Sequence, residues 1–262
     1  MPIHPAAAKG FARSAAAYER GRPEYPPAAI EWVRERLDLG PGRTVVDVAA
    51  GTGKLTRPLA ATGAEVIAVE PVAAMREAIG PGVRALEGTA ESLPLPDESA
   101  DAATVGQAFH WFDGDVALAE LHRVLRPGGG LALVWNRRRV EDPVQAALEE
   151  ILAPHRGFVP SHRRERWHEA FERTRLFGPF EERRFPNEQV LDADGLADRV
   201  GSISFIAALA DPAREDVLSA VRALAADGPV TLRYLGEVQM CRRSPDSSEN
   251  ITRSSRSPLR RR

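Results

Sequence analysis

A glycine-rich loop between a buried strand and a helix constrains this sequence more than any other feature. Residues 44–57 read Thr-Val-Val-Asp-Val-Ala-Ala-Gly-Thr-Gly-Lys-Leu-Thr-Arg. The β-branched start of this segment predicts a strand buried on both faces, and a helical pattern begins at Lys54. Small residues at 49–53 let a ligand lie against bare backbone, and the start of the next helix favours a carboxylate or phosphate. The segment therefore predicts the first unit of a nucleotide-binding α/β domain.

Strand and helix patterns then alternate through the first half of the chain. Further strands are predicted at 65–70, 83–88, 100–105 and 131–135. Such alternation predicts a parallel sheet with right-handed crossovers, whose ligand lies at the carboxyl ends of the strands where the strand order reverses. The candidate site is therefore the set of residues that follow the strands: 49–53, Glu70, 88–91, 106–111 and Asn136.

The second half and the two ends of the chain are less regular. Helical patterns at 142–153, 192–200 and 211–226 accompany strand patterns at 180–185 and 230–240. The first 28 residues hold prolines and aromatic residues without periodicity, which fits either a surface arm or a lid. From about Arg243 onward Ser, Arg and Pro dominate, so this tail is predicted to be disordered.

Composition excludes several classes of protein. The net charge is −2, but seven arginines and two acids lie from Cys241 onward, which leaves −7 on the first 240 residues and argues against a broad nucleic-acid surface. The single cysteine, Cys241, fits a reducing compartment. We expect a cytoplasmic protein without a signal peptide or membrane span, because no apolar run approaches about 20 residues.

These motifs resemble those of the class I S-adenosylmethionine-dependent methyltransferases, over about residues 12–240. The most specific pair of motifs is the acid with its run of small residues at 47–53 and the Arg-Pro-Gly-Gly-Gly turn at 126–130. The acid of the family's second motif maps onto Glu70, after the second strand. The chain is further similar to small-molecule methyltransferases of the ubiquinone-biosynthesis and trans-aconitate type. It departs from the family pattern at Ala49, where the first glycine of the motif is usual.

The resemblance implies a fold and a division of the chain. The fold is α/β and Rossmann-like: a doubly wound, mostly parallel seven-stranded sheet with the last strand antiparallel. Residues 1–28 form the N-terminal arm or lid, 29–240 the methyltransferase domain and 241–262 the disordered basic tail. Within the domain, 40–136 bind the cofactor and 137–228 form insertions on the acceptor side.

The resemblance also implies S-adenosyl-L-methionine as the cofactor. The carboxylate of this molecule suits the helix that starts after Gly53, and its ribose diol suits the carboxylate of Glu70. Asp47 either orders the loop or faces the cofactor ammonium. The residues expected at the cofactor are Asp47, Ala49, Gly51, Thr52, Gly53, Glu70, Pro71, Thr89, Ala90, Glu91, Gln107, Tyr18 and Arg22.

His110 is the candidate catalytic residue. It follows the fourth strand at the rim of the site, where a neutral imidazole near pH 7 can remove a proton from an acceptor. Alternatively, His110 and Trp111 form only the pocket wall, because alignment supplies most of the acceleration of an in-line displacement and a carboxylate acceptor needs no base. The arginine runs at 137–139 and 163–166 fit either a pocket for an acidic substrate or a solvated turn.

Other histidines do not predict a metal site. His122 lies inside a helical pattern, and His155, His162 and His168 lack the accompanying Cys or carboxylate residues. We therefore expect no metal, no nucleic acid, a small-molecule acceptor, and a monomer or homodimer.

Three functions fit the loop, and one is favoured. Methyl transfer to a small molecule is the first, and a regulator or partner subunit that binds S-adenosylmethionine without transfer is the alternative. A nicotinamide-dependent dehydrogenase is disfavoured, because Thr56 occupies the place of the third glycine of the dinucleotide motif and no hydride-transfer constellation is present.

Overall fold

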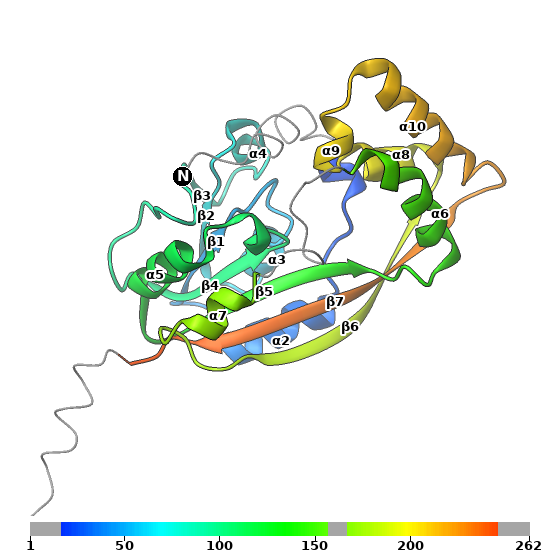
Figure 1. The fold of residues 1–262 in the computed structure, drawn as a ribbon. Helices are drawn as coiled ribbons and strands as arrows, with labels where there is room; N and C mark the ends of the chain where they lie inside the picture. Colours follow the sequence, from blue (N-terminus) through cyan, green and yellow to red (C-terminus); the bar gives the residue numbers. More distant parts are fainter. Residues whose placement is uncertain (1–16, 157–166, 246–262) are drawn as a thin grey trace, which may run out of the picture.

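A seven-stranded sheet organises the computed structural model, which describes residues 17–156 and 167–245. The strands are β1 (Thr44–Val48), β2 (Glu65–Val69), β3 (Arg84–Leu86), β4 (Ala100–Gly106), β5 (Leu125–Arg138), β6 (Glu181–Leu191) and β7 (Val230–Arg242). Their order across the sheet is β3-β2-β1-β4-β5-β7-β6. Strands β1 to β5 pair in parallel, and β7 runs antiparallel to both of its neighbours, which confirms the predicted fold class (Figure 1).

Helices connect the strands. They are α2 (Pro27–Leu37), α3 (Thr56–Ala60), α4 (Ala73–Glu77), α5 (Gly114–Val124), α6 (Pro143–Leu152), α7 (Glu169–Arg173), α8 (Ala193–Gly201), α9 (Ser204–Ala207) and α10 (Asp211–Ala223), with 3-10 turns η1 (Phe109–Trp111) and η2 (Ala153–His155). Residues 17–21 are helical as well. The strand order reverses between β1 and β4, so ligands are expected at the carboxyl ends of these strands.

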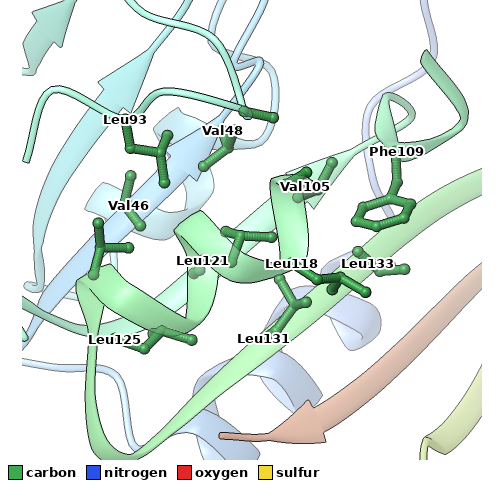
Figure 2. Packing of buried hydrophobic residues seen from close by; sticks show 14 of the residues in the cluster. Val46, Val48, Leu93, Val105, Phe109, Leu118, Leu121, Leu125, Leu131 and Leu133 are labelled. Atoms are coloured by element: carbon green, nitrogen blue, oxygen red, sulfur yellow. The ribbon is translucent and has the colours of Figure 1, made fainter. Parts of the chain in front are cut away.

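Two apolar clusters fill the two faces of the parallel part of the sheet. Figure 2 shows one of them, in which Leu118 and Leu121 of α5 pack among strand residues such as Val46. On the other face, Val33 of α2 packs in a cluster that contains Val45. Neighbouring strand residues alternate between the faces, so the valine run of β1 supplies both clusters and holds the loop that follows it.

A third cluster lies where three long strands extend past the rest of the sheet. Strands β5, β6 and β7 have 14, 11 and 13 residues, whereas β1 has only 5. Helices α6, α8, α9 and α10 gather at that end of the long strands (Figure 1). Their side chains, including Leu148, Leu196 and Val221, bury Leu232 and Tyr234 of β7. The second half of the chain therefore builds a helical cap beside the parallel sheet.

Three strands are longer than the sequence predicts. β5 starts at Leu125, because this residue already pairs with β4 before the irregular stretch that ends at Gly130, so the predicted turn lies inside the strand. β6 continues to Leu191, because each of its residues pairs with β7. β7 reaches Arg242, and Cys241 is buried. The final strand therefore ends two residues beyond the predicted end at 240, and the remaining tail at 246–262 lies outside the described residues.

Candidate functional site

The loop after β1 adopts a conformation suited to glycine at three positions. Ala49, Gly51 and Gly53 have φ angles of 55°, 59° and 86°. The Gly53 N–H donates to the Ala50 carbonyl at 3.0 Å, and the Ala50 N–H donates to the carbonyl of Val69 at 3.2 Å, which fastens the loop to β2. Ala49, where the family pattern has glycine, thus takes the left-handed conformation at a cost of about 1 kcal/mol or more.

Glu70 reaches this loop from the end of β2. One carboxylate oxygen accepts the N–H of Gly51 at 2.9 Å, and the other accepts the N–H of Val72 at 2.9 Å. The residue is buried, and burial raises the pKa of its carboxyl although the two N–H groups oppose that shift. The acid and the glycine loop, 19 positions apart in the sequence, therefore form one unit.

Asp47 of β1 is buried and bonds to two threonine hydroxyls. Its two oxygens accept the hydroxyls of Thr56 at 2.6 Å and Thr104 at 2.9 Å. Only 1% of the residue is exposed, and burial raises the pKa of the carboxyl to about 6 against the effect of both hydroxyls. Asp47 thus ties β1 to β4 and to the start of α3, which supports the first of the two roles that the sequence left open, the ordering of the loop.

The segment after β3 turns back beside α5. Thr89 forms a bridge with Ser92, and Ala90 is buried. The carboxylate of Glu91 accepts the N–H of Asp113, the residue that caps α5, at 3.0 Å. Glu91 therefore has a structural partner at the site rim, and the other two residues lie in the same turn.

Gln107 marks the carboxyl ends of β4 and β5. Its φ is 58°, and its Nε2 donates to the carbonyl of Asn136 at 3.2 Å. The Asn136 side chain donates to the carbonyl of Glu24 at 3.1 Å, and the side chain of Asn187 donates to the same carbonyl at 2.8 Å. Two strands, β5 and β6, thus hold the N-terminal arm through the carbonyl of Glu24.

The described part of the arm, residues 17–26, lies against the glycine loop. Lys54 pairs with Glu24 at 2.5 Å, and Arg57 pairs with Glu19 at 2.5 Å. A Cβ on Gly51 would lie 4.0 Å from the ring of Tyr18. The arm is therefore docked over the loop rather than extended from the surface, which fits the lid better than the free arm.

Tyr25 and Arg22 of the arm are enclosed by the fold. A Cβ on Gly106 would lie 2.5 Å from the hydroxyl of Tyr25, so this glycine admits the tyrosine at the end of β4. Arg22 donates from Nε to the hydroxyl of Ser202 and from Nη2 to its carbonyl, each at 3.0 Å, and its guanidinium lies 4.8 Å from the ring centre of Tyr18. The structure therefore places Tyr18 and Arg22, the two arm residues predicted at the cofactor, side by side next to the glycine loop.

His110 lies in η1, between two tryptophan rings. Its ring centre is 5.2 Å from that of Trp111 and 5.7 Å from that of Trp135. Trp135 in turn lies 5.5 Å from Trp167, so the imidazole lies within an aromatic row beyond β4 that runs from Trp111 to Trp167. This arrangement supports a wall and leaves the proposed role in proton transfer as a prediction.

The remaining sequence candidates have structural partners. Arg137 and Arg139 pair with Glu237 and Glu141, each at 2.7 Å, and Arg138 pairs with Glu149. Arg137 and Arg138 belong to β5, which runs to Arg138, rather than to a free turn. The run at 163–166 and His162 lie outside the described residues.

Two kinds of feature are missing from the described residues. Across 17–156 and 167–245, no cluster of His, Cys, Asp and Glu could hold a metal ion. Within the same ranges, no helix combines the length and the apolar character needed to cross a membrane. His122 donates from Nε2 to the carbonyl of Ser244 at 3.2 Å and lies outside the site.

Sequence reasoning missed the polar residues of the helical cap. Arg199 of α8 is 6% exposed and donates from Nε to the hydroxyl of Tyr234 at 3.1 Å. The signal was present, because Arg199 follows Leu196 by three positions and so lies on the apolar face of its helix. An arginine on the buried stripe of an amphipathic helix marks a position that hydrophobic burial alone does not explain.

Comparisons with known proteins agree with this geometry. A family model described as a methyltransferase domain matches residues 46–133. An uncharacterised methyltransferase of Mycobacterium tuberculosis (strain ATCC 25618 / H37Rv) is 50% identical over 131 residues, which is 49% of this chain and 52% of that protein. The chain therefore spans about half the length of this relative.

Two further proteins match most of the chain. A structure of a protein proposed to be a type II methyltransferase, from Anaeromyxobacter dehalogenans, is 29% identical with a TM-score of 0.58, covering 84% of this chain and 97% of that one. An uncharacterised methyltransferase-like protein of Schizosaccharomyces pombe is 32% identical over 237 residues, which is 89% of this chain and 92% of the relative. The chain therefore belongs to the methyltransferase family, and its sheet order and glycine loop place it with the class I, S-adenosylmethionine-dependent type.

Proposed function

We propose that this protein transfers a methyl group from S-adenosylmethionine to a small-molecule acceptor. One observation carries the proposal: the carboxylate of Glu70 lies 2.9 Å from the N–H of Gly51 in the loop after β1. The acid and the loop that the resemblance implies for cofactor binding thus meet at the point where the strand order reverses. A non-catalytic regulator finds no comparable support in the structure.

The residues present fit this cofactor. The loop offers small residues with positive φ, so its backbone can approach a ligand closely. Each carboxylate oxygen of Glu70 accepts a single N–H, from Gly51 or from Val72. Lone pairs therefore remain on both oxygens for the two hydroxyls of a ribose. We assign the cofactor-facing set as Ala49, Gly51 to Gly53 and Glu70, with Pro71, 89–91, Gln107, Tyr18 and Arg22 around it. Asp47 supports the loop from behind.

The chain's own residues orient the reaction. When bound, the cofactor supplies a methyl group that its sulfonium has already activated. Tyr18, Tyr25 and Arg22 cover the loop and exclude water, and the two-sided anchoring of the arm fixes their positions. We assign His110 as the group that accepts the acceptor's proton where the nucleophile carries one. Alignment of the acceptor with the methyl group then supplies most of the rate.

We also propose how the chain is divided and where it acts. Residues 1–28 serve as the lid, 40–136 bind the cofactor, and 137–228 face the acceptor. Support comes from the separate apolar cluster that the helical cap forms with β7. The buried single cysteine and the acidic first 240 residues fit a cytoplasmic monomer or homodimer that does not bind nucleic acid.

Binding calorimetry of the full chain with S-adenosylhomocysteine tests the proposal. Glu70→Ala should weaken binding by about 1–3 kcal/mol, the scale of a charge-assisted hydrogen bond. Glu65→Ala is the matched control, because Glu65 is exposed at the opposite end of the same strand. If the wild-type chain binds neither S-adenosylmethionine nor S-adenosylhomocysteine, the proposal is wrong. Formation of S-adenosylhomocysteine with a panel of acceptors then separates transfer from binding alone.

A further inference from the structure

We propose that Arg199, together with Arg22, recognises a carboxylate group of the methyl acceptor, so that the acceptor is a small carboxylic acid. This inference rests on the proposed function and adds the chemical class of its substrate. The observation behind it is a buried guanidinium that the chain itself leaves incompletely bonded.

Arg199 carries an unused donor in the interior. Its Nε donates to Tyr234, but its Nη1 is buried and has no hydrogen-bond partner in the described structure. Tyr234 is itself buried and its hydroxyl contacts Gln189 at 3.3 Å, so the partner on the Nε side is neutral. A buried charged donor without an acceptor costs free energy that a surface position would avoid. A ligand that brings a negative charge removes this cost.

Arg22 adds a second cation beside the first. Both of its hydrogen bonds end on Ser202, at the hydroxyl and at the carbonyl, and none of the described acids forms an ion pair with it. Burial, followed by the neighbouring charge of Arg199, lowers the pKa of Arg22 to about 10. Ser202, which accepts both hydrogen bonds of Arg22, donates from its hydroxyl to the carbonyl of Arg199, so it joins the two arginines.

Two further arginines lie in this region. Arg138, at the end of β5, and Arg156 both donate to Glu149. Burial, followed by the charge of Arg199, lowers the pKa of Arg138 as well. These partly buried guanidinium groups add to a positive potential that attracts anions. A guanidinium presents a planar set of donors that matches a carboxylate better than it matches a single oxygen.

The position of the two arginines favours the acceptor over the cofactor as the source of the carboxylate. Glu70 and the glycine loop mark the adenosyl end at β1 and β2, whereas Tyr234 belongs to β7, on the other side of β4 and β5. Arg22 spans part of this interval, because its guanidinium covers the ring of Tyr18 near Gly51. A carboxylate held at Arg199 would therefore orient an acceptor toward the cofactor from the cap side.

Thermal-shift and calorimetric titrations of the full chain with S-adenosylhomocysteine bound test this inference. The probes are citrate, its uncharged trimethyl ester and inorganic phosphate. We expect citrate to raise the unfolding temperature and the ester to have no effect. Arg199→Met should weaken citrate binding about 10- to 100-fold, the range for a lost charged hydrogen bond. Arg222→Met, at an exposed arginine of α10, should leave it unchanged.

The outcomes separate this inference from the proposed function. If the wild-type chain binds S-adenosylhomocysteine but not citrate, the carboxylate site is wrong and the proposed function stands. Loss of S-adenosylhomocysteine affinity in Arg199→Met, without any response to citrate, assigns the arginine to the cofactor and overturns the inference. A stronger response to phosphate than to citrate overturns the assigned class. Should Arg199→Met fail to fold, Arg199→Lys keeps the charge without the planar donors and should still weaken citrate binding.

Discussion

The two halves of the candidate site bury charges of opposite sign. At the ends of β1 and β2 the buried groups are the acids Asp47 and Glu70, whose partners are threonine hydroxyls and main-chain N–H groups. Under the helical cap the charged groups are the buried Arg199 and the partly buried Arg22, and their partners are a tyrosine hydroxyl and Ser202. In both halves neutral dipoles, rather than ion pairs, hold the charge.

The halves differ in how completely the chain satisfies them. Each oxygen of Asp47 and of Glu70 accepts a hydrogen bond within the chain, so this half is assembled before any ligand arrives. Nη1 of Arg199 has no such partner in the described structure. A preorganised half suits a cofactor that is the same in every turnover, and a half with an unused donor suits the substrate that distinguishes one enzyme from another.

The acid half makes the largest prediction, which concerns the pH dependence of stability. The pKa of Asp47 is about 6 in the folded chain and near 4 in the unfolded chain, so the folded state binds more protons between these values. The free energy of unfolding is therefore not reduced by Asp47 below about pH 4, and it decreases by about 3 kcal/mol as the pH rises through about 6. Urea unfolding from pH 4 to 7 should show this decrease in the wild type and not in Asp47→Asn.

Asp101 provides a control of opposite sign. Burial alone would raise the pKa of its carboxyl, but the N–H of Thr44 and the guanidinium of Arg126 outweigh burial and lower the pKa. Its contribution is present at neutral pH and is lost as the pH falls below the ordinary value. Asp101→Asn should therefore remove a slope opposite to that of Asp47. Equal slopes in the wild type and Asp47→Asn would contradict the burial of a charge at Asp47.

The second prediction concerns the arm that joins the two halves. A Cβ on Gly21 would lie within 2.6 Å of main-chain atoms of Asp198 and Arg199, which cannot move aside as a side chain can. Gly21→Ala should therefore undock the arm from α8, at a cost of about 1–3 kcal/mol in the free energy of unfolding. Because the arm also covers the glycine loop, affinity for S-adenosylhomocysteine should fall by roughly tenfold, or about 1.4 kcal/mol.

Gly40→Ala is the matched control for the arm. A Cβ on Gly40 meets nothing within 4 Å, so the same substitution there should change neither stability by more than about 0.5 kcal/mol nor affinity. Urea unfolding and calorimetry measure the two quantities. If Gly21→Ala loses stability but keeps full affinity, the arm is a brace for α8 and not a lid over the cofactor.

The half of the candidate site at β1 and β2 was largely predictable from the sequence. Its strand, loop and acid lie within about 25 residues, and each has a local signal in the sequence. These signals are a β-branched run, closely spaced glycines and an acid at the end of a predicted strand. Sequence alone left open whether Asp47 faces the ligand, because Thr104 reaches it from 57 positions away. The glycine turn at 126–130 was recognised, but the pairing of Leu125 with β4 is a tertiary effect.

The half of the candidate site under the helical cap was not predictable in the same way. Arg22 and Ser202 are 180 positions apart, and Arg199 and Tyr234 are 35 apart on a helix and a strand that pack only in the folded chain. Sequence periodicity places Arg199 on an apolar face but does not name its neighbours. The arm was left open between free and docked for the same reason, since Gly21 contacts α8 through residues far along the chain.

The smallest prediction tests the loop itself, at the position where the chain departs from its family. Ala49 has a φ of 55°, so Ala49→Gly relieves about 1–2 kcal/mol of backbone strain and loses about 0.5–1 kcal/mol to the greater freedom of glycine in the unfolded chain. We expect a net gain of about 0.5–1 kcal/mol in urea unfolding. Ala50→Gly should only destabilise the chain, because Ala50 is not among the positive-φ residues and has no backbone strain for glycine to relieve. This variant keeps the entropic cost of a glycine in the unfolded chain. If both variants are destabilised equally, the left-handed backbone at Ala49 carries no strain, and the alanine is as well suited to this loop as the usual glycine.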